Sequence, residues 1–225
     1  MKSRAPRPSA NGGTTVLSLA EAWNRPAKLA TKRTMDVTIS FVALVGLSPI
    51  LLILAIAVKL SSPGPVFYRW PVVGRNGVPF IGYKFRSMCS NADQLKEQLQ
   101  SRNEMNGPVF KLTNDPRVTK FGAWMRRYSL DELPQLYNVL KGDMSLVGPR
   151  PPLMTEYVHF TEHQRLKLLV KPGITCLWQI NGRNEIKDFD QWVQLDLEYV
   201  RNWSPFLDVW ILWKTAGEIF AGSGK

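Results

Sequence analysis

The chain has 225 residues, with 29 lysines and arginines against 18 aspartates and glutamates, and a formal net charge of +11 at pH 7. This length suits one ordinary domain plus a membrane element, and the basic excess predicts anionic partners such as phosphates, anionic lipid or nucleic acid. The two cysteines are far apart and form no Cys-x-x-Cys pair, so we interpret both as reduced thiols of a cytosolic domain and exclude a disulfide framework.

The first 33 residues are predicted to be a flexible basic tail. They begin with a Pro/Ser/Gly/Arg-rich stretch that ends at Gly13, a composition that cannot bury a core. Leu17 to Leu29 has the pattern of a short amphipathic helix lying on a membrane. A basic tail without a helix fits these residues equally well.

Val37 to Val58 is the longest apolar run, 22 residues without a charge. As a helix it would be roughly 33 Å long, enough to cross a bilayer once. Ser48-Pro49 lies in its middle, and a proline there frees a carbonyl and bends a helix. Basic residues flank the run almost equally, so the positive-inside rule gives no direction. A hairpin that enters and leaves on one face explains both facts, and a plain spanning helix remains the alternative.

A turn at 61–65 ends this segment, and a β-hairpin is predicted after it. Its strands are Val66 to Tyr68 and Phe80 to Met88, and Asn76-Gly77 is the hairpin turn. Lys84 and Arg86 are two residues apart, so a strand would carry both on one face. Two cations aimed the same way suit a diphosphate, while the alternative is an exposed basic edge strand.

Further along, hydrophobic periodicity predicts five helices and a short strand from Ile174 to Ile180. The helices are Asp93 to Glu104, Val118 to Tyr128, Leu133 to Leu140, Phe189 to Trp203 and Phe206 to Phe220. The second of these is amphipathic and suits a membrane surface or a core. His159-x-x-Glu162-His163 matches an inverted zinc-protease pattern, but we discount it because nothing nearby marks a third ligand.

An acidic pair, Asp131-Glu132, lies between two of these helices and directly after two arginines. Ser129-x-x-Glu132 reads as a capping box, which would place both acids in the first turn of a helix. Pro134 allows a later start with Asp131 as the cap. Either arrangement puts the acids at the positive end of a helix dipole, where carboxylates stay ionised and phosphate is attracted. For an isolated pair, a capped surface helix is the alternative.

Eight stretches together carry a family resemblance. They are Lys32-Arg33-x-x-Asp36, Ser48-Pro49, Ser62-Pro63-Gly64-Pro65, Lys84-Phe85-Arg86-Ser87-Met88, Asp115-Pro116-Arg117-Val118-Thr119, Ser129 to Gln135, Val147 to Pro151, and Lys171-Pro172-Gly173-Ile174-Thr175. In this order the chain resembles the bacterial sugar transferases, the small monotopic polyprenyl-phosphate phosphoglycosyl transferases of exopolysaccharide synthesis.

The resemblance implies a helix-dominated α+β fold with one re-entrant membrane helix bent at Ser48-Pro49, interfacial amphipathic helices and a small β-hairpin. It implies transfer of a sugar-1-phosphate, with galactose or glucose as the expected sugar, from a UDP-sugar to undecaprenyl phosphate, with release of UMP. The product would be the first lipid-linked sugar of an exopolysaccharide, capsule or O-antigen repeat. Mg²⁺ is the implied cofactor, and the bacterial inner membrane, on its cytoplasmic face, is the implied location. Membrane lipid is an expected partner, nucleic acid is not, and homo-oligomerisation is left open.

Residue by residue, the resemblance makes Asp131 the nucleophile and Glu132 its partner acid, with both as metal ligands. Five more positions match functional positions of the family that bind substrate or phosphate: Lys84, Arg86, Arg126, Arg150 and Asp196. We divide the chain into the tail at 1–33, a membrane helix-break-helix at 34–60 and a cytoplasmic catalytic domain at 61–225. Two stretches depart from the family pattern, Trp70-Pro71-Val72 and Cys176.

The chemistry of the residues agrees with this resemblance. Phosphoryl transfer needs positioning and charge neutralisation, and adjacent helical carboxylates point about 100° apart, which suits two different roles better than a symmetric acid–base pair. A nucleic-acid-binding protein would explain the charge but not the apolar run. A non-catalytic membrane scaffold would explain the run but not acids flanked by arginines.

Asp196 falls on the apolar stripe of the helix predicted from Phe189 to Trp203, so it needs a charged partner. The partner could be a core arginine in a structural ion pair. We predict instead that Asp196 closes the active site and faces Lys84, Arg86 or the metal.

Overall fold

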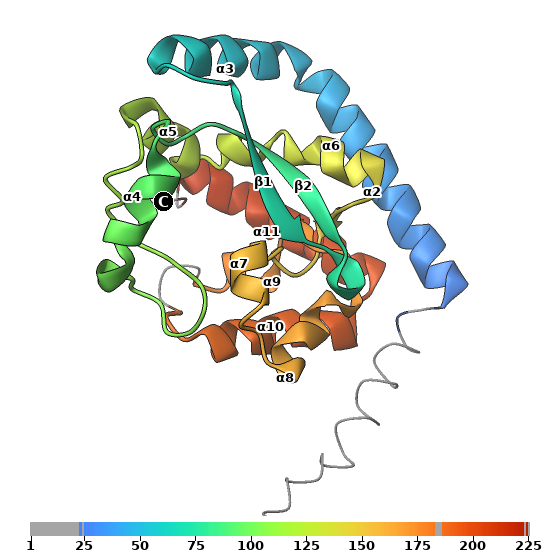
Figure 1. The fold of residues 1–225 in the computed structure, drawn as a ribbon. Coiled ribbons are helices and arrows are strands. Elements are labelled where there is room, and N and C mark those ends of the chain that lie inside the picture. The colour runs from blue at the N-terminus through green and yellow to red at the C-terminus, as the bar shows by residue number, and fades with distance from the viewer. Residues whose placement is uncertain (1–22, 24, 183–185, 223, 225) are drawn as a thin grey trace, which may run out of the picture.

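A computed structural model of the chain describes residues 23, 25–182, 186–222 and 224. The predicted tail and the helix predicted from Leu17 to Leu29 lie largely outside the described residues. Helices dominate the rest, with two small sheets, which confirms the helix-dominated α+β class (Figure 1).

The helices and strands follow one another closely along the chain. The α-helices are α2 (Pro26–Gly46), α3 (Ser48–Ser61), α4 (Ala92–Gln98), α5 (Lys120–Arg127), α6 (Gln135–Lys141), α7 (Met154–Tyr157), α8 (Glu162–Arg165), α9 (Leu177–Ile180), α10 (Phe189–Asn202) and α11 (Pro205–Ala221). The strands are β1 (Phe67–Val73), β2 (Pro79–Phe85), β3 (Ser145–Val147) and β4 (Gly173–Thr175). Four 3₁₀ turns lie between them: η1 (Arg75–Gly77), η2 (Gln100–Arg102), η3 (Leu130–Glu132) and η4 (Leu166–Leu169).

The long apolar run is a bent pair of helices, α2 and α3, which arches around the outside of the molecule in Figure 1. The two helices meet at Leu47 with a bend of 65°. Pro49 lies in the first turn of α3, where its missing N–H costs nothing, and the Ser48 hydroxyl donates to the Val45 carbonyl at 2.7 Å. The predicted break at Ser48-Pro49 is therefore confirmed. In the described part of the chain no helix alone is long and apolar enough to cross a membrane, whereas the bent pair together is, by length and composition.

The predicted β-hairpin is also confirmed, with a longer first strand. β1 and β2 pair antiparallel, with Phe67 opposite Phe85 and Val73 opposite Pro79. Asn76 and Gly77 have φ angles of 57° and 81°, the left-handed conformation that the predicted turn requires. The predicted first strand ended at Tyr68, whereas β1 continues through Pro71 to Val73; in a two-stranded sheet both strands are edge strands, where proline is tolerated.

The second sheet, of β3 and β4, runs parallel and differs from the prediction. β3 was not predicted, and the strand predicted from Ile174 to Ile180 ends at Thr175, after which the chain turns into α9. Strands of three residues are too short to show a period. Their tight contact depends on glycine, because a Cβ on Gly173 would lie 2.1 Å from the backbone nitrogen of Gly148.

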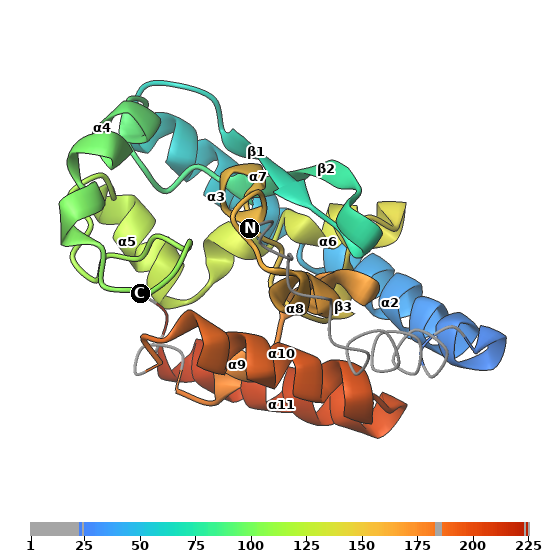
Figure 2. The same ribbon diagram turned by 60° about the horizontal axis from the view of Figure 1, so that its bottom comes forward.

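The predicted helices near the C-terminus are confirmed as α10 and α11. Figure 2 shows them as one layer, with the β-hairpin on the other side of the molecule. The Ser204 hydroxyl caps α11 by accepting from the Leu207 N–H. The main apolar cluster lies between these helices, α6 and β3, and includes Val139, Met144, Val147 and Ile211.

Both ends of the bent helix pair are held by polar contacts to the rest of the fold. At the α2 end, Lys32 pairs with Asp208 of α11 at 2.6 Å, and Asp36 accepts from the Ser145 hydroxyl and the Leu146 N–H at 2.9 Å each. Arg33 adds two bonds of 2.6 Å to the last carbonyls of α6. We call Lys32, Arg33 and Asp36 with these partners the α2 anchor.

At the α3 end, a single arginine just after β2 makes the connection. Arg86 donates to the carbonyls of Val58 at 3.1 Å, Ser62 at 2.6 Å and Pro65 at 2.6 Å. We call this cluster the α3 anchor. The two anchors tie both ends of the apolar segment to the same folded body.

Candidate active site

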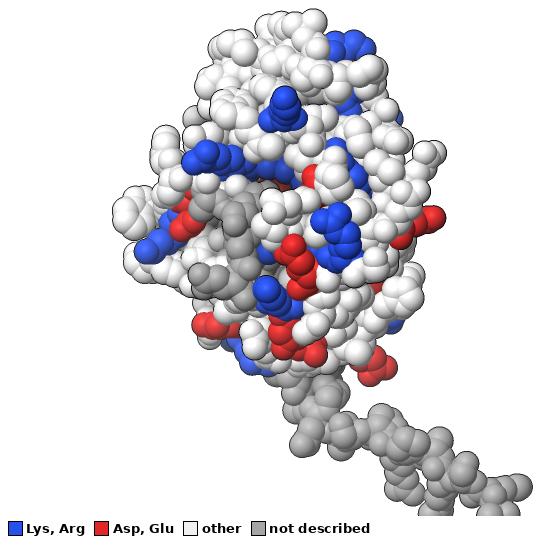
Figure 3. Space-filling model, turned by 90° about the vertical axis from the view of Figure 1, so that its left-hand side faces the viewer, with Lys and Arg blue, Asp and Glu red and all other residues white. Residues whose placement is uncertain are grey.

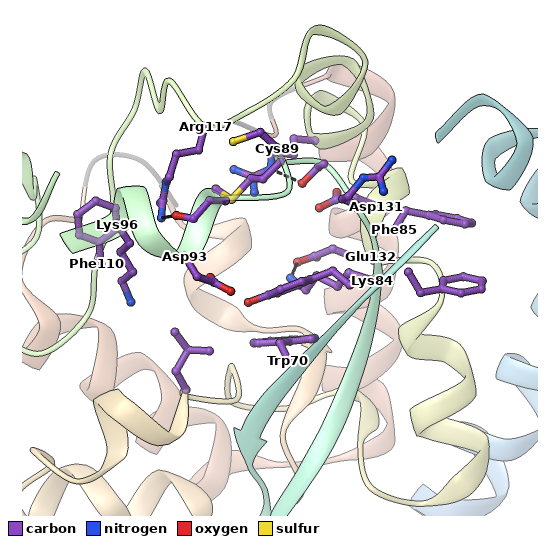
Figure 4. A pocket seen from close by; sticks show the side chains of 18 of the residues that line it. Trp70, Lys84, Phe85, Cys89, Asp93, Lys96, Phe110, Arg117, Asp131 and Glu132 are labelled. Atoms are coloured by element: carbon purple, nitrogen blue, oxygen red, sulfur yellow. Dashed lines mark hydrogen bonds and ion pairs between the residues drawn. The ribbon is translucent and has the colours of Figure 1, made fainter. Parts of the chain in front are cut away.

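A cavity of about 380 Å³ lies between β2, α4 and the acidic pair. We call it the first cavity. Figure 4 shows Asp131, Glu132 and Lys84 on one side of it and Asp93, Lys96 and Arg117 on the other. The predicted residues that line it are Lys84, Arg86, Arg126, Asp131, Glu132 and Arg150. The fold thus brings together six side chains from three separate stretches of the sequence, 84–86, 126–132 and 150.

Asp131 and Glu132 lie in the 3₁₀ turn η3, and only 7% and 8% of their surfaces are exposed. The predicted capping box is wrong, because Ser129 has a left-handed φ of 52° and its hydroxyl caps nothing. The alternative cap at Asp131 is also wrong, since α6 begins at Gln135 with Pro134 at the cap position. The left-handed residue turns the chain sharply between α5 and η3, and this turn directs the acids into the cavity.

Glu132 is held by Lys84, whose ammonium lies 2.6 Å from its carboxylate. The same ammonium lies 4.6 Å from the centre of the Trp70 ring, a cation–π distance. Burial lowers the pKa of Lys84, and the nearby Arg150 guanidinium lowers it further, while the carboxylates of Glu132 and Asp131 oppose both effects. Trp70, noted in the sequence only as a departure, thus forms a wall of the site and contacts its lysine.

Two arginines complete the basic side of the first cavity. The Arg126 Nε donates to the Ser87 hydroxyl at 2.9 Å, and burial lowers the pKa of its guanidinium, although Asp131 nearby works in the opposite direction. Arg150, in the loop after β3, lines the same cavity. Figure 3 looks onto the face at the left of Figure 1, where basic side chains border a hollow.

Arg86 differs from its prediction. It borders the first cavity, but its guanidinium donates to the backbone carbonyls of the α3 anchor. β2 ends at Phe85, so the strand alternation that would place Lys84 and Arg86 on one face stops before the arginine. The prediction of two cations aimed together is therefore wrong.

Asp196 does not face the site. Its carboxylate pairs with Lys167 at 2.5 Å, and both side chains are 1% exposed. Burial raises the pKa of Asp196, against the effect of Lys167. Lys167 also lies over the rings of Trp192 and Phe189, at 5.1 and 5.7 Å. The predicted contact with Lys84, Arg86 or a metal is wrong, and the alternative of a buried ion pair holds, with a lysine as the partner.

The sequence missed several lining residues, among them Tyr68, Asp93 and Glu156. No pattern in the chain marks them. Burial raises the pKa of Glu156, whose carboxylate accepts from the Leu153 N–H at 3.0 Å. Across the described residues no group of three or more His, Cys, Asp or Glu side chains could hold a metal ion.

Comparison with known proteins gives the family. Residues 27–222 match the family described as "Bacterial sugar transferase". The chain is 43% identical over 94% of its length to "Galactosyl transferase CpsE" of Streptococcus agalactiae serotype III, strain NEM316. It is 43% identical over 90% of its length to "UDP-glucose:undecaprenyl-phosphate glucose-1-phosphate transferase" of Escherichia coli K12. It is 41% identical over 89% of its length to "Exopolysaccharide production protein ExoY" of Rhizobium meliloti strain 1021.

Coverage differs among these relatives. The chain spans 47% of CpsE and 43% of the E. coli protein, about half of their length, but 90% of ExoY. The match covers both the bent helix pair and all six predicted residues that line the first cavity. The chain therefore belongs to the bacterial sugar transferase family.

Proposed function

We propose that this chain transfers the sugar-1-phosphate of a UDP-sugar, with galactose or glucose as the sugar, to undecaprenyl phosphate, and releases UMP. The observation that carries this proposal is the buried Asp131-Glu132 pair in a cavity lined by three cations, Lys84, Arg126 and Arg150. The relatives' names point to the same chemistry, galactosyl transfer in one and transfer of glucose-1-phosphate to undecaprenyl phosphate in another.

The reaction proceeds as two displacements at one phosphorus atom. In the first, an Asp131 carboxylate oxygen attacks the phosphorus that carries the sugar, and the bond from that phosphorus to the bridging oxygen breaks. UMP leaves with the bridging oxygen and its electron pair, and a carboxylate–phosphate anhydride forms. In the second, a phosphate oxygen of undecaprenyl phosphate attacks the same phosphorus. This step restores the Asp131 carboxylate and gives the lipid diphosphate sugar.

The cations of the first cavity stabilise the charge that this chemistry gathers there. Arg126 lies near Asp131 and, with Arg150, suits the oxygens of a diphosphate. Lys84 holds Glu132 in place by an ion pair of 2.6 Å. We assign the attack to Asp131, the position at which the resemblance to the family places the nucleophile.

Mg²⁺ is part of this proposal, and the residues present fit it. Magnesium is commonly bound by one or two carboxylates plus substrate phosphates and waters, and Asp131 and Glu132 supply two adjacent carboxylates. When bound, the ion would neutralise charge on the diphosphate. Asp131 and Glu132 are the residues that would hold it.

A re-entrant α2–α3 segment in the bacterial inner membrane, with the site on the cytoplasmic face, completes the proposal. The two anchors support it, because they hold the start of α2 and the end of α3 against one folded body. A helix that crossed a bilayer once would put its ends on opposite sides. A bend of 65° lets the chain return to the side on which it entered.

The decisive experiment replaces the nucleophile. Asp131→Asn should abolish turnover, because an amide oxygen is a poor nucleophile, while membrane insertion stays intact. Mass spectrometry of the wild-type enzyme with UDP-galactose or UDP-glucose alone should show a phosphosugar adduct on Asp131. Asp93→Asn, a change at an exposed acid on the opposite wall, is the matched control and should retain the adduct. UMP release that strictly requires the lipid acceptor would contradict the covalent step.

A further inference from the structure

A second cavity of about 910 Å³ adjoins the first. Arg117, Arg126 and Arg150 line both cavities, so they form the wall between them. Asp131 and Glu132 line only the first cavity. The reaction proposed above uses the first cavity and leaves the role of the second open.

The second cavity is strongly basic. Its charged lining residues in the described part of the chain are Lys111, Asp115, Arg117, Arg126, Arg127 and Arg150. The single acid among them, Asp115, is already paired with Arg117 at 2.6 Å. Cations therefore outnumber anions by four, and this excess favours a ligand that carries phosphate.

The surroundings of the two cavities differ. The first cavity is bordered by Phe67 and Tyr68, which are 46% and 41% exposed and follow the end of α3, near Leu60 at 82%. The second is lined by the polar residues Thr113 and Asn114 and by no described residue before Met88, so the segment that follows α3 borders only the first cavity. The tail of a lipid acceptor fits the first surrounding, and a water-soluble nucleotide fits the second. The acceptor phosphate takes the place at the arginine wall that UMP vacates, because the second displacement is also in line.

The geometry of phosphoryl transfer agrees with this division. The attacking and leaving oxygens lie roughly in line on opposite sides of the phosphorus. Because Asp131 attacks from the first cavity, the leaving UMP must lie on the far side of the phosphorus from it. The wall of Arg126 and Arg150 suits the diphosphate at that position, with the second cavity beyond it.

We infer that the second cavity binds the uridine 5′-phosphate part of the donor, with the diphosphate against Arg126 and Arg150 and the sugar in the first cavity. This inference rests on the proposed function. The stacked indoles of Trp178 and Trp192, 4.1 Å apart, give the second cavity an aromatic wall beside its polar rim, the combination typical of small-molecule sites.

The test fills the second cavity without touching the first. Ala123, exposed on α5, lines only the second cavity, so Ala123→Trp should weaken binding of radiolabelled UMP at least tenfold in equilibrium dialysis. Lys120→Trp places the same bulk on the same helix at a residue that lines neither cavity, and it should bind UMP normally. Arg127→Gln removes one positive charge from the second cavity and should weaken UMP binding severalfold. This variant replaces Ala123→Trp in the test if Ala123→Trp does not fold.

Steady-state kinetics separate the two substrates. Ala123→Trp should raise the KM for the UDP-sugar at least tenfold and leave the KM for undecaprenyl phosphate unchanged, whereas Tyr68→Ala should raise the KM for undecaprenyl phosphate. Wild-type UMP affinity in folded Ala123→Trp and in Arg127→Gln would overturn the inference, as would an effect on the acceptor KM alone. UMP binding can be measured without turnover, so it tests the second cavity alone. The proposed function is tested separately, by the phosphosugar adduct on Asp131.

Discussion

At the scale of single residues, Lys84 determines how the site should respond to pH. Its ammonium holds Glu132, and burial lowers its pKa below that of an ordinary lysine. Below this lowered pKa the lysine is charged and the ion pair is intact; as the pH rises through it, the proton and the ion pair are lost. Activity should therefore fall in the alkaline range at a lower pH than an exposed lysine would give. Lys84→Arg should shift this alkaline limb of the pH–rate profile to higher pH, because a guanidinium keeps its proton.

The matched control for this prediction is Lys96→Arg, at a lysine that also lines the first cavity but lies on α4, over the Phe110 ring at 5.7 Å. Its alkaline limb should coincide with that of the wild type. An alkaline limb that stays in place in Lys84→Arg would assign the titration to a different group.

Asp196 is a second residue whose replacement gives a clear answer. Its partner Lys167 is as deeply buried, so Asp196→Asn would leave an uncompensated cation in an aromatic cluster. Removing one member of a buried pair typically costs about 3–5 kcal/mol, and we expect a lower melting temperature and a lower yield of folded protein. Each correctly folded molecule should keep its activity, because Asp196 lies outside the first cavity.

Glu198→Gln tests the specificity of that effect. It removes a carboxylate from the same helix, α10, at an exposed position, and should leave the melting temperature unchanged. A normal melting temperature together with lost activity in Asp196→Asn would mean that Asp196 acts in the reaction after all.

At the scale of elements, the sequence predicted the helices that carry a long hydrophobic period and the break that contains a helix-breaking proline. The stripe from Phe189 to Trp203 and the proline at Pro49 each leave a pattern in the chain, and the structure has α10 and the helix break there. Short elements leave no such pattern. β3 has three residues, and η3 depends on a left-handed serine, Ser129, that resembled a capping residue.

The candidate site was predictable only in part for the same reason. The charge pattern pointed to Asp131 and Glu132, and the family resemblance added Lys84, Arg126 and Arg150; the fold does bring these five residues to one cavity. What each charge contacts depends on where a strand ends and which segments pack together, as the anchoring role of Arg86 and the ion pair of Asp196 demonstrate. Distant partners of this kind have no local signal in one sequence.

The bent helix pair carries the prediction at this scale. Thr31 and Lys59 are exposed near its two ends, so single cysteines there, in a variant lacking Cys89 and Cys176, should react with a membrane-impermeant reagent from the same side of sealed vesicles. Pro49→Ala restores a helical N–H and should reduce the bend. Labelling of the two positions from opposite sides would establish a spanning helix instead.

At the scale of the whole molecule, the contact between Lys32 and Asp208 joins the first described helix to the last. Asp208 also accepts from the Tyr199 hydroxyl at 2.8 Å and the Trp203 indole N–H at 3.1 Å. Lys32→Met should destabilise the fold, because it leaves the Asp208 carboxylate buried without its cation. The double variant with Asp208→Asn removes the charge as well and should recover part of the loss.

A double-mutant cycle on denaturation free energies measures this coupling. We expect the two single changes to sum to more than the double change costs. Strict additivity would mean that the pair contributes nothing and that α2 is held by Arg33 and Asp36 alone.

The two anchors have a mechanical consequence for the molecule on a bilayer. A body attached to an embedded rod at one point can swivel around that point, but a body attached at both ends of a bent rod has one orientation. With the bend buried in the lipid, the first cavity would lie at a fixed height above the membrane surface. The proposed acceptor, undecaprenyl phosphate, would then be selected by how far its headgroup rises from the membrane, and the length of its tail would matter little.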